Sequence, residues 1–140
     1  MLTRISGEQT DGRYSTVECL APAGDTVPLH RHTRDDEAFH VLEGELTVWV
    51  GDTVRRLGPG DCALAPIGVS HVYRVTSDGP ARWLATCSPA GFEQFLAAYG
   101  EPAGERRLPD PAPPDIERLG KLAAEHGIEL LGPPGTLPSA

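Results

Sequence analysis

Up to about residue 90, regularly spaced turn signals divide the chain into short segments rich in β-forming residues. Glycine, proline and aspartate gather at 21–25, 51–52, 58–61 and 77–80. Between the turns lie strand candidates at 14–20, 26–32, 37–50 with a turn at 43–44, 62–65, 71–76 and 82–86. Short strands at this spacing are typical of a β-sandwich or β-barrel.

The rest of the chain predicts helices. Ser88 and Pro89 fit an N-cap and a first helical turn, and Gly100 fits a C-cap. Between them, Phe92, Phe95, Leu96 and Tyr99 recur at helical spacing. A proline-rich, charged stretch over 101–114 predicts an extended linker. A second helix is expected from Asp115 to about His126, with its apolar face formed by Ile116, Leu119, Leu122 and Ala123. A loose tail is expected at 132–135.

These patterns predict an all-β fold with a short C-terminal helical extension. We expect a β-barrel over 1–88, and over 89–140 an extension that contains the proline-rich linker. The chain has 140 residues, enough for a single core, and shows no internal repeat, so one barrel is expected rather than two.

The acidic composition excludes some classes of partner. The net charge is -8 and the isoelectric point is about 5.0, whereas nucleic acids and anionic membranes attract basic surfaces. No apolar run is long enough to span a bilayer, and the N-terminus lacks the apolar stretch of a signal peptide, so we expect a cytoplasmic protein. Cys19, Cys62 and Cys87 have no CxxC spacing and are expected to be reduced, packed thiols.

Three histidines and a glutamate form a candidate metal site. His30 and His32 lie two residues apart, which on a strand places both side chains on one face. Glu37 follows after a turn, and His71 belongs to a distant strand candidate. Taken singly, each histidine is more typical of a structural or exposed position. Together, three imidazoles and a carboxylate suit a divalent transition metal better than calcium or magnesium.

Two motifs at these positions resemble those of the cupin superfamily. The first, G(X)5HXH(X)3–4E(X)6G, is matched at Gly24, His30, His32, Glu37 and Gly44. The second, G(X)5PXG(X)2H(X)3N, is matched at Gly60, Pro66, Gly68 and His71, but Val75 stands at its final position. In the family that final Asn is not a metal ligand, so the departure leaves the expected site intact.

The resemblance implies a single-domain cupin, a jelly-roll β-barrel that binds one metal ion through His30, His32, Glu37 and His71. The ion would be Fe, Ni, Mn, Co, Cu or Zn. The segments 36–44, 89–95 and 127–134 are similar to quercetin 2,3-dioxygenase-like cupins. That similarity implies a dioxygenase acting on a flavonol-like or other aromatic, enolisable small molecule, with Glu37 as both ligand and catalytic base.

Two other functions stay open at this point. One is a non-redox cyclase or isomerase, with the metal acting as a Lewis acid on a polyketide-like or sugar-like substrate. The other is a non-catalytic small-molecule binder, although the sequence offers no DNA-binding domain and no cluster of basic residues that would support a sensor role.

Further residues are assigned by strand alternation. Phe39 shares the face of Glu37, and Tyr73 shares that of His71, while Trp83 lies on the last strand. These three aromatic residues are candidates to bind substrate. The alternative is that they only fill the interior of the barrel. His40 falls on the opposite face and is expected to point outward. The run 34–36 is expected to be a solvated loop at the mouth, where Arg34 is an outside candidate for substrate contact.

We also expect a homodimer. Barrels of this kind leave strand edges and apolar outer faces that a second copy can cover, and an outward Trp49 would suit such an interface.

Overall fold

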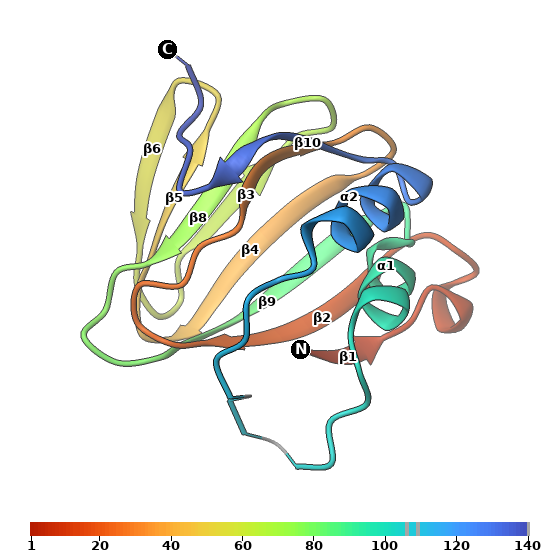
Figure 1. The fold of residues 1–140 in the computed structure, drawn as a ribbon, viewed down its shortest axis with the longest axis horizontal. Helices are drawn as coiled ribbons and strands as arrows, with labels where there is room; N and C mark the ends of the chain where they lie inside the picture. Colours follow the sequence, from red (N-terminus) through yellow and green to blue (C-terminus); the bar gives the residue numbers. More distant parts are fainter. Residues whose placement is uncertain (106, 109, 140) are drawn as a thin grey trace.

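The strands form two antiparallel sheets of a jelly roll in this computed structural model, which describes residues 1–105, 107–108 and 110–139 (Figure 1). One sheet has the order β1 (Leu2–Ile5), β2 (Ser15–Ala21), β9 (Ala81–Ser88), β4 (Asp36–Glu43), β7 (Cys62–Ala65). The other has the order β10 (Ile128–Pro134), β3 (Pro28–His32), β8 (His71–Val75), β5 (Leu46–Val50), β6 (Thr53–Leu57). The described residues also form a short 3-10 helix, η1 (Glu8–Thr10), and two α-helices, α1 (Phe92–Tyr99) and α2 (Ile116–Glu125). The predicted all-β jelly roll with short C-terminal helices is confirmed.

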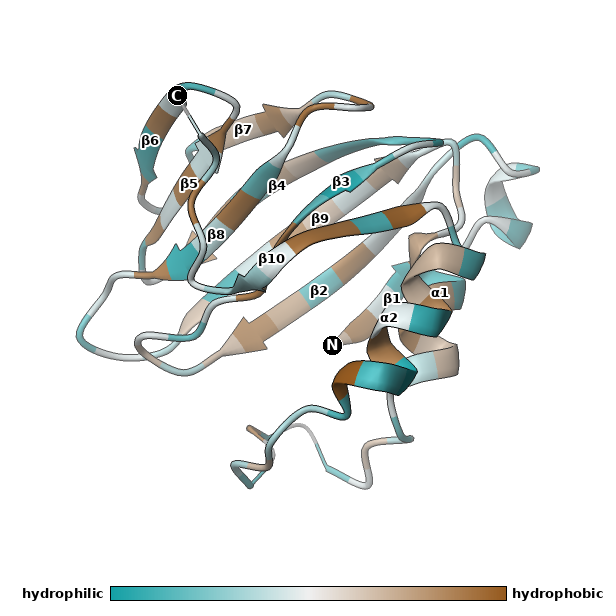
Figure 2. Cartoon of the chain, turned by 45° about the horizontal axis from the view of Figure 1, so that its top comes forward, coloured by the Kyte–Doolittle hydropathy of each residue, from teal (hydrophilic) through white to brown (hydrophobic). Residues whose placement is uncertain are grey.

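Alternation along the strands builds the core. On β4, Glu37, Phe39 and Val41 are buried while His40 is exposed, as the period of two requires. On β9, Trp83 is one of four buried residues that alternate with partly exposed ones. Side chains from both sheets meet in one apolar cluster, and apolar residues recur along the strands in the hydropathy colouring (Figure 2). The polar Glu37 thus lies on the inner face of an otherwise apolar strand.

Two strands at the ends of the sheets were not predicted. Strand β6 pairs with β5 through the tight turn at Gly51, whose φ of 56° suits glycine. Only Leu57 of β6 is buried, so the strand lacks the apolar alternation by which strands are recognised. Strand β1, next to β2, is mostly exposed for the same reason.

Strand β10 corrects the prediction of a loose tail at 132–135. It runs to Pro134 and pairs antiparallel with β3, which places Leu130 opposite His30 and Ile128 opposite His32. The prolines are tolerated because β10 is an edge strand, where missing N–H donors cost little. The division of the chain at residue 88 remains a prediction, but the segment after it is not purely helical, since it adds a strand to the sheet that carries two of the histidines.

The two helices pack against each other, with α1 beside β2 and α2 beside β10 (Figure 1). Helix α2 is capped by Asp115, which accepts a hydrogen bond of 3.0 Å from the Arg118 N–H. Gly100 caps the end of α1, as predicted. The N-cap of α1 is Gly91, however, and not Ser88. Within the described residues, neither helix is long and apolar enough to cross a bilayer.

A second apolar cluster joins the helices to the barrel. Its buried members are Phe95 of α1, Ala123 of α2 and Ile128 of β10, whereas Ile116, predicted on the apolar face of α2, is exposed. The predicted linker over 101–114 contains no helix or strand where it is described, and residues 106 and 109 lie outside the described residues. The helical segment therefore packs on the barrel through the same strand that pairs with β3.

The cysteines are free thiols, as predicted, but not all are packed. Cys19 and Cys87 are buried, whereas Cys62 at the start of β7 is exposed, which corrects the expectation of three packed thiols.

Candidate metal centre

The structure brings the four predicted ligands together between the sheets. His30 and His32 project from β3, and His71 of β8 stands directly opposite His30 in the strand register. Glu37 reaches the same point from β4, in the facing sheet. One ligand atom of each residue lies within 4.8 Å of the corresponding atom of every other. The ring centroids of His30 and His71 are 4.3 Å apart, and that of His32 is 5.4 Å from both.

One nitrogen of each imidazole is fixed by a partner outside the centre. His30 Nδ1 is 2.8 Å from the Pro28 carbonyl, and His71 Nδ1 is 2.9 Å from the Val69 carbonyl. Because a carbonyl oxygen can only accept, each of these nitrogens carries the proton. His32 Nδ1 in the same way lies 2.7 Å from the Asp35 carboxylate. The Nε2 atoms of the neutral rings therefore present lone pairs to the centre.

These lone pairs face a carboxylate. Glu37 Oε2 lies 3.0 Å from His71 Nε2 and 3.5 Å from His32 Nε2. His32 Nε2 is buried and has no hydrogen-bond partner among the described residues. Glu37 is 4% exposed, so water cannot easily hydrate its charge. Lone pairs that converge in a buried place are stabilised by a cation. The imidazole nitrogens and the Glu37 carboxylate therefore fit a metal ion.

The ionisation of Glu37 and His30 follows from this crowding. Burial alone would raise the pKa of Glu37, but the three histidines that surround its carboxylate outweigh burial and lower that pKa to about 2. Burial and the neighbouring His71 lower the pKa of His30 to about 4. At neutral pH, Glu37 is thus ionised and His30 is neutral, the states in which both act as metal ligands.

Asp35 is a residue of the centre that the sequence did not reveal. It was expected in a solvated loop at the mouth, but it is 8% exposed and hydrogen-bonded to His32. Burial alone would lower the pKa of His32, yet the hydrogen bond to Asp35 and the charges of Glu37 and Asp35 raise it. Burial raises the pKa of the Cys87 thiol, which stays protonated near Asp35. No pattern of spacing could have found Asp35, because its role depends on how the turn folds back.

A cavity of about 500 Å³ opens onto the centre, with His30 and Glu37 in its wall. Two of the predicted substrate residues, Tyr73 and Trp83, line this cavity, and their ring centroids are 4.9 Å apart. Phe39 does not line it. The ring of Phe39 packs in the apolar core, with its centroid 6.3 Å from those of His71 and Tyr73, so its assignment to substrate binding is not supported.

The helical segment forms another part of the cavity wall. Both helices and β10 contribute apolar side chains to this wall. They are Phe92, Phe95, Leu96 and Tyr99 of α1, Leu119 of α2, and Ile128, Leu130 and Pro134 of β10. The Phe92 ring lies over His32, with the two centroids 5.5 Å apart. The C-terminal segment therefore forms part of the cavity wall, which the sequence does not reveal.

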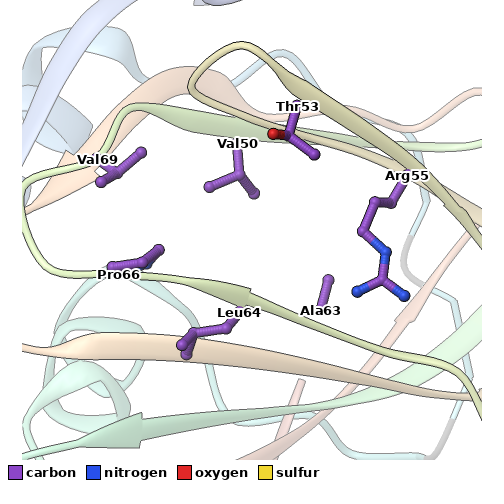
Figure 3. A pocket seen from close by; sticks show the side chains of 7 residues that line it. All are labelled: Val50, Thr53, Arg55, Ala63, Leu64, Pro66 and Val69. Carbon is purple, nitrogen blue, oxygen red and sulfur yellow. The ribbon is translucent and has the colours of Figure 1, made fainter.

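The other residues weighed from sequence lie away from the centre. His40 is exposed, as predicted, and Val75 is buried in the apolar core. The Arg34 guanidinium donates to the Glu125 carbonyl at 3.4 Å, at the end of α2. A smaller cavity of about 250 Å³ lies between the β5–β6 hairpin and β7 (Figure 3), and Arg55 is the one charged residue in its wall. It contains none of the predicted ligands.

Comparisons with known proteins agree with this arrangement. A model of the Cupin domain matches residues 16–87, just over half of the chain. Quercetin 2,3-dioxygenase of Bacillus subtilis (strain 168) is 34% identical over 103 residues, which cover 72% of this chain but only 30% of that protein.

Two solved structures are similar at 33% identity. A protein of Thermus thermophilus matches with a TM-score of 0.53, over 56% of this chain and 74% of its own. The DMSP lyase DddQ from Ruegeria pomeroyi DSS-3 matches with a TM-score of 0.50, over 55% of this chain and 39% of its own. The family match over residues 16–87 agrees with the two-sheet jelly roll and with the two sequence motifs. The chain belongs to the cupin family.

Proposed function

We propose that this cupin binds one divalent transition metal ion through His30, His32, Glu37 and His71. The observation that carries the proposal is the convergence of Nε2 lone pairs and a carboxylate in a buried place, with each Nδ1 already fixed by an acceptor. Imidazole nitrogens with one carboxylate suit Fe, Ni, Mn, Co, Cu or Zn, whereas calcium and magnesium prefer oxygen ligands.

We further propose that the protein is a dioxygenase of a flavonol-like or other aromatic, enolisable small molecule. Two observations support this: the similarity to a quercetin 2,3-dioxygenase, and an aromatic cavity with His30 and Glu37 in its wall. A redox-active ion bound here would supply electron transfer between substrate and dioxygen, which is the oxidant and contributes both of its atoms to the product.

The chain's own residues have distinct tasks in this reaction. Glu37 is ionised, so its carboxylate oxygen can accept the proton of the substrate's enol or phenol group. Tyr73, Trp83 and Phe92 provide ring surfaces against which a flat substrate can pack. The apolar wall contributed by both sheets and the helices excludes water from the reacting atoms.

Oxygen uptake by the metal-loaded protein, screened over flavonols and polyketide aromatics, tests the proposal. Glu37→Gln keeps the size and one oxygen ligand but removes the basicity, so turnover should fall about 100- to 10,000-fold while part of the metal remains. The control is Glu18→Gln, which alters a buried carboxylate paired with Arg4 at 2.5 Å, outside the centre. Near-normal turnover of metal-replete Glu37→Gln would show that Glu37 is a ligand only.

A non-redox reaction of the Lewis-acid type is the second candidate. The observation that favours it is the similarity, at 33% identity, to a structure that is a DMSP lyase. In that case the same four residues would hold the ion, which would polarise an oxygen atom of the substrate. Conversion of a substrate under strictly anaerobic conditions, with no oxygen consumed in air, would favour this candidate over the dioxygenase.

A further inference from the structure

The large cavity has polar groups at two separate places. His30 and Glu37 mark the metal centre, and Asp25, Thr26 and Tyr73 form a second polar region in the wall. The Asp25 carbonyl accepts a hydrogen bond from the Val75 N–H at 2.9 Å, so Asp25 lies beside the end of β8 opposite to His71. Val75 lies four positions along the strand from His71, which corresponds to about 13 Å.

Asp25 in this second region has spare capacity to accept hydrogen bonds. Its carboxylate is half-buried. Among the described residues, the only side chain that donates a hydrogen bond to it is Tyr73, whose hydroxyl oxygen lies 3.3 Å from Asp25 Oδ2. The Thr26 hydroxyl has no proton left to donate to a ligand, because it already donates to the Tyr73 carbonyl at 2.7 Å. A carboxylate can accept several hydrogen bonds, so Asp25 offers free acceptor sites in the cavity wall.

Both groups of the pair can bond a further partner. The Tyr73 hydroxyl carries one proton, which it can donate either to Asp25 or to a ligand in place of that long contact. Burial raises the pKa of Asp25, against the opposing effect of the hydrogen bond from Tyr73. The second region thus presents an acceptor and a donor side by side.

We propose that Asp25 and Tyr73 bind a hydroxyl group at the far end of an elongated aromatic ligand, whose other end carries the oxygen that binds the metal. The inference rests on the proposed function and narrows its substrate class to flat molecules with a terminal phenol. A hydroxyl donates to Asp25 and accepts from Tyr73, whereas an ammonium group has no lone pair for Tyr73. The cavity volume of about 500 Å³ is in the range of small-molecule sites.

A matched pair of ligands tests the inference: flavonol, and flavonol with a hydroxyl at the 4′ position of its phenyl ring. Binding to the metal-loaded protein is measured anaerobically through the quenching of tryptophan fluorescence, to which Trp83, a buried residue in the cavity wall, contributes. The wild type should bind the hydroxylated ligand about tenfold more tightly or better. Asp25→Ala should lose this preference while its affinity for plain flavonol stays within about twofold, because only the terminal hydrogen bond is removed.

Further variants make the result specific. Tyr73→Phe, which keeps the ring, should reduce the preference, and Asp25→Asn should retain part of it because the amide oxygen still accepts. Asp52→Asn removes a negative charge from an exposed turn and should keep the full preference. The inference is overturned by a preference in Asp25→Ala equal to that of the wild type, by no preference in the wild type, or by no binding of either ligand.

Failure of the proposed function would look different. The hydroxylated flavonol would then bind with an affinity that depends on Asp25, which supports the inference, but would not be oxidised when air is admitted to the metal-loaded protein.

Discussion

Among the acceptors that fix the three imidazoles, Asp35 alone carries a charge. His30 and His71 donate to main-chain carbonyls, whereas His32 donates to the Asp35 carboxylate at 2.7 Å. A carboxylate in this position orients the ring and makes the opposite nitrogen a stronger ligand. Because His32 donates its Nδ1 proton to Asp35, this carboxylate is placed to orient His32 in the proposed metal centre.

Asp35→Asn is expected to weaken metal binding about 10- to 100-fold, because the amide keeps the shape but loses the charge that polarises His32. Competition with a chromophoric chelator measures the affinity. Glu18→Gln, which alters a buried carboxylate paired with Arg4, serves as the control and should bind metal like the wild type. Equal affinities of Asp35→Asn and the wild type would mean that His32 is oriented by packing alone.

At the level of residues, the sequence predicted what depends on spacing and missed what depends on the folded turn. The motif spacing was sufficient to name the four residues whose ligand atoms converge. Alternation correctly placed Phe39 inside, but it could not distinguish the wall of the cavity from the core behind it. Asp25 and Asp35 both lie in segments with turn character, where sequence period gives no direction for a side chain.

At the level of elements, β10 links the C-terminal segment to the metal centre. It pairs with β3, which carries His30 and His32, and its inner residues face the helices and the cavity. The sequence does not reveal this strand, because Gly132 and the following prolines are turn-forming residues, and the tertiary structure decides whether a sheet edge tolerates them. It does not reveal β6 either, because exposed arginines interrupt the apolar pattern of that strand.

Strand β10 contains a matched pair of sites for a stability test. Ile128 is 5% exposed and packs between the helices and the barrel, whereas Leu131 on the same strand is 42% exposed. Ile128→Ala should lower the free energy of unfolding by about 2–5 kcal/mol, because it leaves a space in a packed cluster. Leu131→Ala should change it by less than about 0.5 kcal/mol. Urea unfolding of both variants measures the difference, and equal effects would mean that β10 is not firmly packed.

For the whole molecule, the edges of the two sheets at β6 and β7 leave apolar side chains in solvent. Val54, Leu64 and the adjoining Ile67 are all exposed, and Leu64 lines the small cavity (Figure 3). Unpaired strand edges with apolar residues favour association with another chain. The homodimer expected from the sequence stays a prediction, and this face is where the structure offers apolar area for it.

Light scattering at micromolar concentration should therefore give the mass of a dimer. Leu64→Lys places a charge on the exposed apolar edge and should shift the mass towards the monomer, while Leu131→Lys, on β10, should not. A monomeric wild type would contradict the prediction. A Leu64→Lys variant that is still a dimer would mean that the interface lies on another face of the molecule.

The central claim is that four side chains hold one metal ion, and elemental analysis of the anaerobically purified protein tests it most directly. We predict close to one divalent transition metal ion per chain in the wild type. His32→Ala and His71→Ala should lose most of that metal, and both should unfold at a lower temperature because the ion stabilises the fold that binds it. His40→Ala, which alters an exposed histidine on β4, should keep it. A wild type without metal, or undiminished metal in both His32→Ala and His71→Ala, would contradict the account.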